Sequence, residues 1–320
     1  MRFVTAAQIA QAAPFPALID ALERAFAADP PACVAPPRAH RAVTVAGEPA
    51  RTLLTMAAWG ADGGAVVKLV NVVPANGAKG LPAVQAVALV SDPATGAWVA
   101  ALDGAALTAR RTAAASALAA RHLARADARA LCMVGGGALS RELIAAHAAV
   151  RPIREVAVWT RRPAQAEEVA GWARAQGFDA RAVGPAPEAL AEAVGAADIV
   201  SCATLSTAPL VRGAWLRPGV HLDLVGAFRP DMRETDAEAV ARAQVFVDTR
   251  AGAEGEAGDL LQARAEGGFD FADLRADLAE LCAGRKPGRA DAAAITLFKS
   301  VGAALEDHVA ARLVLSELAR

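Results

Sequence analysis

Residues 130–140 read ALCMVGGGALS, and residues 155–162 read EVAVWTRR. The first stretch is an apolar strand followed by a glycine turn, and a helical pattern continues over residues 141–150. The second stretch is another apolar strand. This order of strand, glycine turn, helix and strand is typical of dinucleotide-binding units, because the glycines let the backbone approach a pyrophosphate and the helix N-terminus attracts it.

The residues expected to contact a dinucleotide lie in this unit and at two later strand ends. The pyrophosphate contacts are predicted at the backbone of Gly135, Gly137, Ala138 and Leu139. The strand ends at Thr204, Val225 and Gly226 are predicted to position a nicotinamide ring. The third glycine of the usual fingerprint is replaced by Ser140. The alternative interpretation is a purely structural turn in an alanine-rich chain.

The second strand ends in Thr160, Arg161 and Arg162. Units that bind NAD carry an acidic residue at this place, which accepts a hydrogen bond from the ribose 2′-OH. A guanidinium instead suits a 2′-phosphate, so the sequence predicts NADPH as the coenzyme, with NADH also possible. The alternative interpretation is a pair of solvated loop arginines.

The composition describes a globular protein with a large core. The chain has 320 residues, enough for two domains, with 55% hydrophobic and 21% charged residues. Its net charge of −1 gives no bulk attraction to nucleic acid or to a membrane surface. We find no signal peptide and no apolar run long enough to cross a bilayer, so we expect a cytoplasmic protein without membrane or nucleic-acid partners.

Cysteine and tyrosine usage narrows the possible chemistry. The four cysteines are far apart and show no metal-ligand spacing, so no metal site is expected. There is no tyrosine, which excludes the Tyr-Lys acid/base pair of short-chain dehydrogenases. Acid/base catalysis would therefore use His, Lys, Asp or Glu, or the substrate's own proton.

The element pattern predicts an α/β protein with two domains. Residues 5–28 are predicted to form one helix, several strands follow before residue 103, and residues 108–124 form a long helix. Strands and helices then alternate, which predicts a Rossmann-type doubly wound parallel sheet over residues 125–296. Residues 297–318 are predicted to form a final long helix. The second α/β domain would therefore consist of residues 1–124 with residues 297–320.

Short motifs are distributed along nearly the whole chain. They are KLV (68–70), GLP (80–82), LTARRTAAAS (107–116), the glycine turn, VGA (225–227), RPD (229–231), RE (233–234), GDL (258–260) and ITLFKSVG (295–302). In this order they resemble the ornithine cyclodeaminase/μ-crystallin family. The resemblance implies a nicotinamide-dependent enzyme with a Rossmann domain and a second domain that binds the substrate and forms a homodimer.

The resemblance also implies a set of substrate-binding residues for a small imino or amino acid. The family's carboxylate-binding positions match Lys68 and Arg111, and its N-terminal arginine matches Arg38 or Arg41, of which we favour Arg38. Lys68 and Arg111 are the predicted catalytic residues. This set is chemically reasonable, because a buried carboxylate needs paired, hydrogen-bonded cations.

Each of the two central cations has a simpler alternative interpretation. Lys68 lies inside an apolar run, and strand alternation places it on one face with Val66 and Val70, but it could also be a lysine at a sheet edge. Arg111 could lie on a helix surface. The acidic pair Glu306 and Asp307 is interpreted as part of a solvated helix face.

Ornithine cyclodeaminases of the family carry an aspartate directly after Val-Gly-Ala, where this chain has Phe228. Phenylalanine cannot act as a base or orient water, so reduction of a preformed C=N bond is the better prediction. The predicted activity is NAD(P)H-dependent reduction of 1-pyrroline-2-carboxylate or 1-piperideine-2-carboxylate to proline or pipecolate. The alternatives are an ornithine cyclodeaminase or alanine-type dehydrogenase, and a non-catalytic NADPH-binding protein of the μ-crystallin kind.

Overall fold

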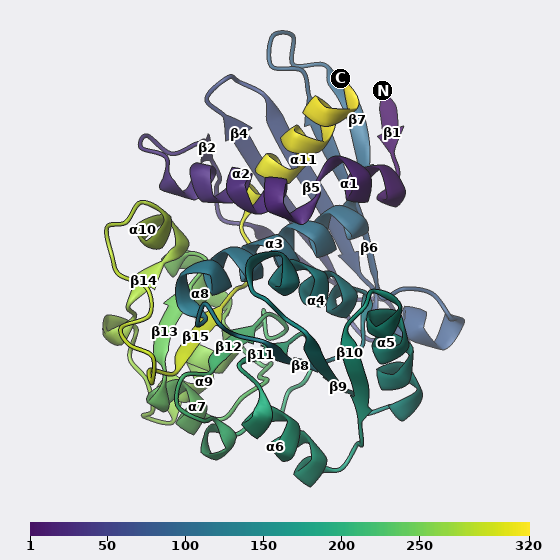
Figure 1. Cartoon of the computed structure of the whole chain (residues 1–320). Helices are drawn as coiled ribbons and strands as arrows, with labels where there is room; N and C mark the ends of the chain where they lie inside the picture. Colours follow the sequence, from purple (N-terminus) through teal and green to yellow (C-terminus); the bar gives the residue numbers. More distant parts are fainter. The chain divides into compact units, whose positions relative to one another are not determined.

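A computed structural model describes residues 1–76 and 78–320 in full, and for residue 77 it gives the secondary structure alone. The chain divides into two compact units, which are described separately (Figure 1). Unit 1 contains residues 1–112 and 303–320, and unit 2 contains residues 113–302. The domain boundaries predicted from the sequence, after residues 124 and 296, lie near these division points.

Unit 1 is built on a mainly antiparallel sheet of seven strands. The strands are β1 (Arg2–Val4), β2 (Cys33–Val34), β3 (Ala39–Val43), β4 (Arg51–Gly60), β5 (Ala65–Val72), β6 (Val84–Ser91) and β7 (Trp98–Asp103). Their spatial order is β1-β7-β6-β5-β4-β2, and β3 also pairs with β4. Only β1 pairs in parallel, with β7.

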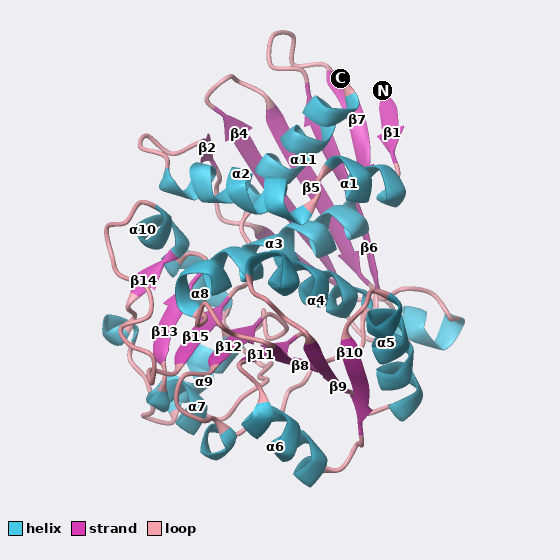
Figure 2. Cartoon of the chain, in the orientation of Figure 1, coloured by secondary structure: helices cyan, strands magenta, loops and turns pink.

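Helices cover one face of this sheet (Figure 2). The helices of unit 1 are α1 (Ala6–Ala12), α2 (Phe15–Ala27), the 3₁₀ helix η1 (Pro74–Lys79), the first part of α3 (Gly104–Leu123) and α11 (Ala304–Leu318). The single helix predicted over residues 5–28 is wrong, because the chain breaks at Pro14, which precedes α2 as its N-cap. Thr5 does cap α1, in a capping box with Gln8.

The two faces of the unit 1 sheet differ in exposure. Residues 66, 68 and 70 of β5 are buried, so Lys68 shares its face with Val66 and Val70 as strand alternation predicts. On the opposite face, apolar residues of β4, β5 and β6 remain partly exposed. This open sheet face consists of Leu53, Ala57, Trp59, Val67, Leu69, Val87 and Leu89.

Unit 2 is built on a parallel sheet of eight strands. The strands are β8 (Ala130–Val134), β9 (Glu155–Trp159), β10 (Asp179–Val183), β11 (Ile199–Cys202), β12 (His221–Leu224), β13 (Gln244–Val247), β14 (Ala276–Asp277) and β15 (Thr296–Lys299). Their order is β10-β9-β8-β11-β12-β15-β13-β14. The order reverses between β8 and β11, and such a switch point opens a crevice at the carboxyl ends of the strands.

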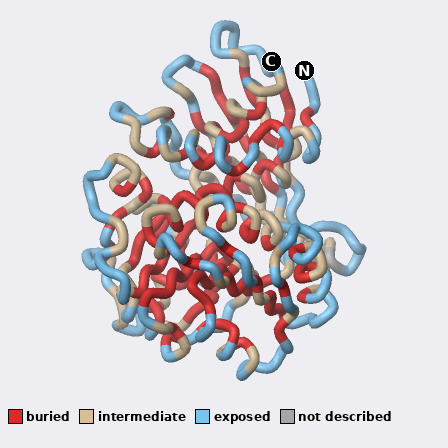
Figure 3. The backbone as a smooth tube through the Cα atoms, viewed as in Figure 1, coloured by how far each residue is buried: buried red, intermediate tan, exposed pale blue. Residues whose placement is uncertain are grey.

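Helices pack on both faces of the parallel sheet, which confirms the predicted Rossmann-type fold. They are the remainder of α3, then α4 (Ala138–Val150), α5 (Pro163–Ala175), α6 (Pro187–Ala196), η2 (Gly213–Trp215), α7 (Ala237–Arg242), α8 (Arg250–Glu256), α9 (Gly258–Ala265), η3 (Phe271–Asp273) and α10 (Leu278–Cys282). Buried residues of α6 to α9 form one apolar cluster with side chains of β8, β11 and β12. The central strands β11, β12 and β15 are accordingly buried along their length (Figure 3).

The helix predicted over residues 297–318 is wrong at its start. Residues 296–299 form strand β15, which lies between β12 and β13 in the middle of the parallel sheet. A short apolar run that is buried on both faces cannot be told from a helix segment by periodicity alone. Among the described residues, no helix combines the length and apolarity needed to cross a bilayer.

Candidate active site

The glycine turn follows β8 and leads into helix α4. Gly135 has a φ of +133°, and a Cβ on it would lie 2.7 Å from the carbonyl oxygen of Ala203. Around Gly137, by contrast, no atom lies within 4 Å of the place that a Cβ would take. The N–H groups of Ala138 and Leu139 are in the first turn of α4, where the helix offers them no acceptor. Open space in front of such donors fits the pyrophosphate of a dinucleotide.

Gln165 of α5 links the glycine turn to the end of β9. Its Nε2 donates to the Gly136 carbonyl at 2.7 Å, and its Oε1 accepts from Arg162 Nη2 at 3.1 Å. The Thr160 hydroxyl also donates to the Arg162 carbonyl at 2.6 Å. Arg162 is thereby tied to the glycine turn, while Arg161 is exposed and has no hydrogen bond to the other described residues. Sequence analysis missed Gln165, since nothing in its local pattern marks it.

The carboxyl ends of β11 and β12 are joined by the side chain of Glu234. Its Oε1 accepts from the Thr204 N–H at 2.6 Å and from the Thr204 hydroxyl at 2.9 Å. Its Oε2 accepts from the Gly226 N–H at 2.7 Å. A Cβ at Gly226 would lie 2.0 Å from the Thr204 carbonyl oxygen, so this approach requires glycine. Glu234 thus fixes Thr204 and Gly226, two of the positions predicted to support the nicotinamide ring. Val225 lies beside Gly226, and its N–H donates to the Cys202 carbonyl at 2.9 Å.

Glu234 belongs to a buried charged cluster with Asp259 and Lys299, all three without solvent exposure. Asp259 Oδ1 accepts from the backbone N–H groups of Glu234 and Thr235 at 2.7 and 3.0 Å, and its Oδ2 lies 3.3 Å from Lys299 Nζ. Burial raises the pKa of Glu234 to about 7; Asp259 adds to this shift and Lys299 opposes it. The cluster gives a structural reason for the Gly-Asp-Leu and Phe-Lys-Ser motifs.

The second set of predicted site residues lies in unit 1, where Lys68 and Arg111 meet at one carboxylate. Asp307 Oδ1 accepts from Lys68 Nζ at 2.8 Å and from Arg111 Nε at 2.9 Å. Arg111 Nη1 also donates to Glu306 Oε2 at 2.6 Å. None of the four side chains is more than 5% exposed. Glu306 and Asp307 are therefore buried partners of the cations, and their interpretation as a solvated face is wrong.

The buried cluster shifts the pKa values of both cations. Burial lowers the pKa of Lys68 to about 8, and the charge of Arg111 lowers it further, while Asp307 and Glu306 raise it. For Arg111, burial also lowers the pKa, but the two carboxylates outweigh it and the net pKa lies above its ordinary value. The pKa of Lys68 is thus far closer to neutral than that of an ordinary lysine, whereas Arg111 stays charged.

The two candidate N-terminal arginines differ in their surroundings. Arg38 is partly buried in the segment before β3, and its charge contributes to lowering the pKa of His40. Arg41 lies on β3 and is exposed, with its Nη1 bonded to the His40 carbonyl at 3.1 Å.

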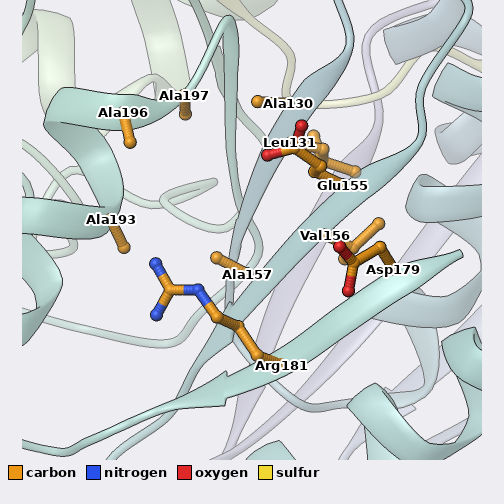
Figure 4. Close-up of a pocket in the computed structure, with 10 residues that line it drawn as sticks. All are labelled: Ala130, Leu131, Glu155, Val156, Ala157, Asp179, Arg181, Ala193, Ala196 and Ala197. Atoms are coloured by element: carbon orange, nitrogen blue, oxygen red, sulfur yellow. The ribbon is translucent and has the colours of Figure 1, made fainter.

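A pocket in unit 2 lies at the opposite edge of the parallel sheet from the glycine turn. It is lined by residues that begin β8, β9 and β10 and by the end of α6 (Figure 4). Its charged side chains are Glu155, Asp179 and Arg181. Because dinucleotides bind at the carboxyl ends of the strands, this pocket is not the coenzyme site. Among the described residues, no three His, Cys, Asp or Glu side chains are grouped to hold a metal ion.

Comparisons with known proteins agree with this geometry. Delta(1)-pyrroline-2-carboxylate reductase of Paracoccus denitrificans is 39% identical over 274 residues, 85% of each sequence. The structure of Thermococcus litoralis Delta(1)-pyrroline-2-carboxylate reductase with NADH and L-proline is similar with a TM-score of 0.92 and 34% identity, covering 100% of this chain and 98% of that one. The structure of an archaeal alanine dehydrogenase dimer with bound NAD is similar with a TM-score of 0.89 and 28% sequence identity, and the match covers 100% of this chain and 96% of that chain. The model of the ornithine cyclodeaminase/mu-crystallin family matches residues 2–320. The chain therefore belongs to the ornithine cyclodeaminase/mu-crystallin family.

Proposed function

We propose that this chain is an oxidoreductase that reduces a cyclic ketimine carboxylate, 1-pyrroline-2-carboxylate or 1-piperideine-2-carboxylate, to proline or pipecolate. The observation that carries this proposal is the meeting of Lys68 and Arg111 at one oxygen of Asp307. Two adjoining cations, held in place and largely shielded from water, suit a small carboxylate substrate. The activity for which the Paracoccus and Thermococcus relatives are named supports the same assignment.

Both cations keep donors for a substrate. Among the described residues, Lys68 Nζ donates only to Asp307, which leaves two of its three N–H groups. Arg111 uses Nε and Nη1, and its Nη2 has no acceptor in the described part of the chain. Arg38, which is less exposed than Arg41, is the better candidate for a third contact. Unit 1 would accordingly bind the substrate and unit 2 the coenzyme.

The coenzyme is proposed to be NADPH, with NADH as the less preferred form. The glycine turn and the first turn of α4 would hold its pyrophosphate, and Arg161 with Arg162 would hold a 2′-phosphate. The position of Arg162, tied through Gln165 to the glycine turn, supports this preference. The two similar structures contain NADH and NAD, so the preference for NADPH is tested directly by replacing Arg161 and Arg162.

In the proposed reaction, Lys68 and Arg111 bind the substrate carboxylate and thereby orient its C=N bond. The bound nicotinamide supplies the hydride, which is added to C2 of the ring. A protonated C=N nitrogen is the better hydride acceptor, and its proton comes from solvent or from Lys68. Holding the carboxylate at two points removes much of the orientational entropy from the barrier.

Phe228 favours reduction over ammonia elimination. Its ring is partly buried and packs against the apolar cluster of unit 2, and its N–H donates to the Gly226 carbonyl at 3.0 Å. An apolar side chain at this position offers no base or water ligand. An amino-acid dehydrogenase using the same two cations is the second candidate, supported by the similar alanine dehydrogenase structure.

The test is an NADPH oxidation assay with a panel of substrates: cyclic imino acids, 2-oxo acids with ammonia or methylamine, and L-ornithine with NAD⁺. We expect turnover with the cyclic imino acids to exceed that with the other compounds. Turnover confined to 2-oxo acids with ammonia would establish the dehydrogenase instead, and NADPH binding without any turnover would establish a binding protein.

The open sheet face of unit 1 supports assembly as a homodimer. Its apolar residues adjoin one another across β4, β5 and β6, with the polar residues Thr55, Asn71 and Gln85 on the same face, and an exposed apolar patch of this kind usually marks an interface. Replacing Leu69, at the centre of this face, with Glu should convert the dimer to a monomer in light scattering. A dimer that persists in L69E would place the interface elsewhere.

A further inference from the structure

Asp307 occupies a position that the proposed reaction leaves unexplained. It lies in the first turn of α11, a helix end that favours negative charge, and its side chain is only 2% exposed. Its partner Lys68 is 239 residues away in the sequence, and Arg111 is 196 residues away. Burying a carboxylate is unfavourable unless it is paired, so the fold places this group specifically against the two cations.

A single oxygen of Asp307 sets the spacing of both cations. Lys68 Nζ and Arg111 Nε both bind Oδ1, which keeps these nitrogens within about 6 Å of each other, a range in which like charges lower each other's pKa. Lysine has a flexible four-carbon stem, and two neighbouring cations repel. Without Asp307, the ammonium of Lys68 would lose both its anchor and its compensating charge.

The groups that face Lys68 are few. Arg111 comes from α3, and Asp307 and Glu306 come from α11. The residues paired with Lys68 on the neighbouring strands are Met56 and Ala88, which do not titrate. Glu306 accepts from Arg111 at 2.6 Å and raises the pKa of Lys68 less than Asp307 does. Asp307 is therefore the main source of negative charge at the ammonium.

We propose that Asp307 is a positioning residue for the reaction: it holds Lys68 in the protonated form and fixes Lys68 and Arg111 at the separation that a substrate carboxylate bridges. This inference rests on the proposed function. Protonated Lys68 is required whether it only binds the carboxylate or also gives its proton to the imine nitrogen. In the second case an N–H bond of Lys68 breaks as the new N–H bond forms, and neutral Lys68 recovers a proton from water.

The experiment compares the pH dependence of kcat/KM in wild type, D307N and E306Q, with imino acid as the varied substrate. In wild type, kcat/KM should fall on the basic side of its pH profile, called the basic limb here, as Lys68 loses its proton near pH 8. In D307N, the limb should move to lower pH by about one unit or more, because a neighbouring opposite charge shifts a pKa by 1–3 units. E306Q is the matched control: it removes an equally buried carboxylate that bonds to Arg111 and raises the pKa of Lys68 less than Asp307 does, so it should raise KM with a smaller shift of the basic limb.

A purely structural role would lower activity without moving the limb, and that result would overturn the proposal. Coenzyme titration by fluorescence checks that D307N is folded. If D307N does not fold, D307E keeps the charge but displaces its oxygens. The value of kcat/KM for D307E should then fall at least about tenfold, because small misplacements of binding groups cause losses of this size. The basic limb of the pH profile should stay in place. Unchanged kinetics in D307E would overturn the proposal. If wild type reduces no imino acid, the proposed function itself fails, which is a different outcome.

Discussion

The ionisation of Glu234 should make the stability of this protein depend on pH in an unusual direction. Burial, with a contribution from Asp259, raises the pKa of Glu234 from 4.5 to about 7. The folded state therefore holds a proton that the unfolded state releases between these pH values. The corresponding contribution to stability is fully present below pH 4.5 and is lost as pH rises through 7.

The size of this effect follows from the shift. Each pKa unit corresponds to about 1.4 kcal/mol, so the full shift corresponds to about 3 kcal/mol of unfolding free energy. Glu234→Gln removes the titrating group and keeps the shape of the side chain. One amide oxygen can still accept from Thr204, but the amide nitrogen cannot accept from the Gly226 N–H.

The assay is urea unfolding, followed by tryptophan fluorescence, at several pH values between about 5 and about 8. The difference in unfolding free energy between wild type and E234Q should fall by about 2.5 kcal/mol over this range, because part of the full effect is already lost at about pH 5. Glu188→Gln, on the exposed first turn of α6, is the control, because it removes a solvated carboxylate and should leave the slope unchanged. Parallel curves for wild type and E234Q would refute the reasoning.

Three further substitutions test the proposed site. Arg111→Ala would remove a buried cation from both Glu306 and Asp307 and cost about 3–5 kcal/mol of stability, so Arg111→Lys is the cleaner change. Arg111→Lys should raise KM for the imino acid at least about tenfold while NADPH still binds in a fluorescence titration, and an unchanged KM would remove Arg111 from the site. The double variant R161A/R162A should reduce the preference for NADPH over NADH, measured as the ratio of their kcat/KM values, by about ten- to a hundredfold. This is the effect of losing one or two hydrogen bonds to a charged group. An unaltered ratio would contradict the 2′-phosphate contact. Gly137→Ala should leave the melting temperature unchanged, because nothing lies near its Cβ, yet it should weaken coenzyme binding, and equal affinity would show that the pyrophosphate lies elsewhere.

The local pattern around residues 130–162 predicted the coenzyme-binding half of the molecule well. The strands β8 and β9, the turn and helix α4 follow from apolar runs and glycines that act over a few residues. The alternation in β5 likewise predicted that Lys68 faces inward, and the burial of Val66 and Val70 on the same face confirms it. Short-range sterics and the hydrophobic effect decide such features, so they can be recognised without tertiary contacts.

Lys299 illustrates what the local pattern left undecided. The sequence predicts one long helix from Leu297 onward, but the structure places residues 296–299 as β15 in the middle of the sheet. A charged residue inside an apolar run was a usable signal, as it was for Lys68, because such a charge needs a buried partner. The identity of that partner, Asp259, depends on how the chain folds back.

The sequence alone predicted the family and the Rossmann-type sheet, which are confirmed, because both follow from motifs of adjacent residues. It also proposed Lys68 and Arg111 as the two substrate-binding cations, which stays a prediction. Only the tertiary structure decided that Asp307 and Glu234 are buried at the ends of α11 and of two strands, where they organise other groups. A carboxylate on a helix or in a loop looks the same in sequence whether it faces water or a cation. For Asp307, the partners that distinguish the two cases lie 196 and 239 residues away in the sequence, and for Glu234 they lie 8 and 30 residues away.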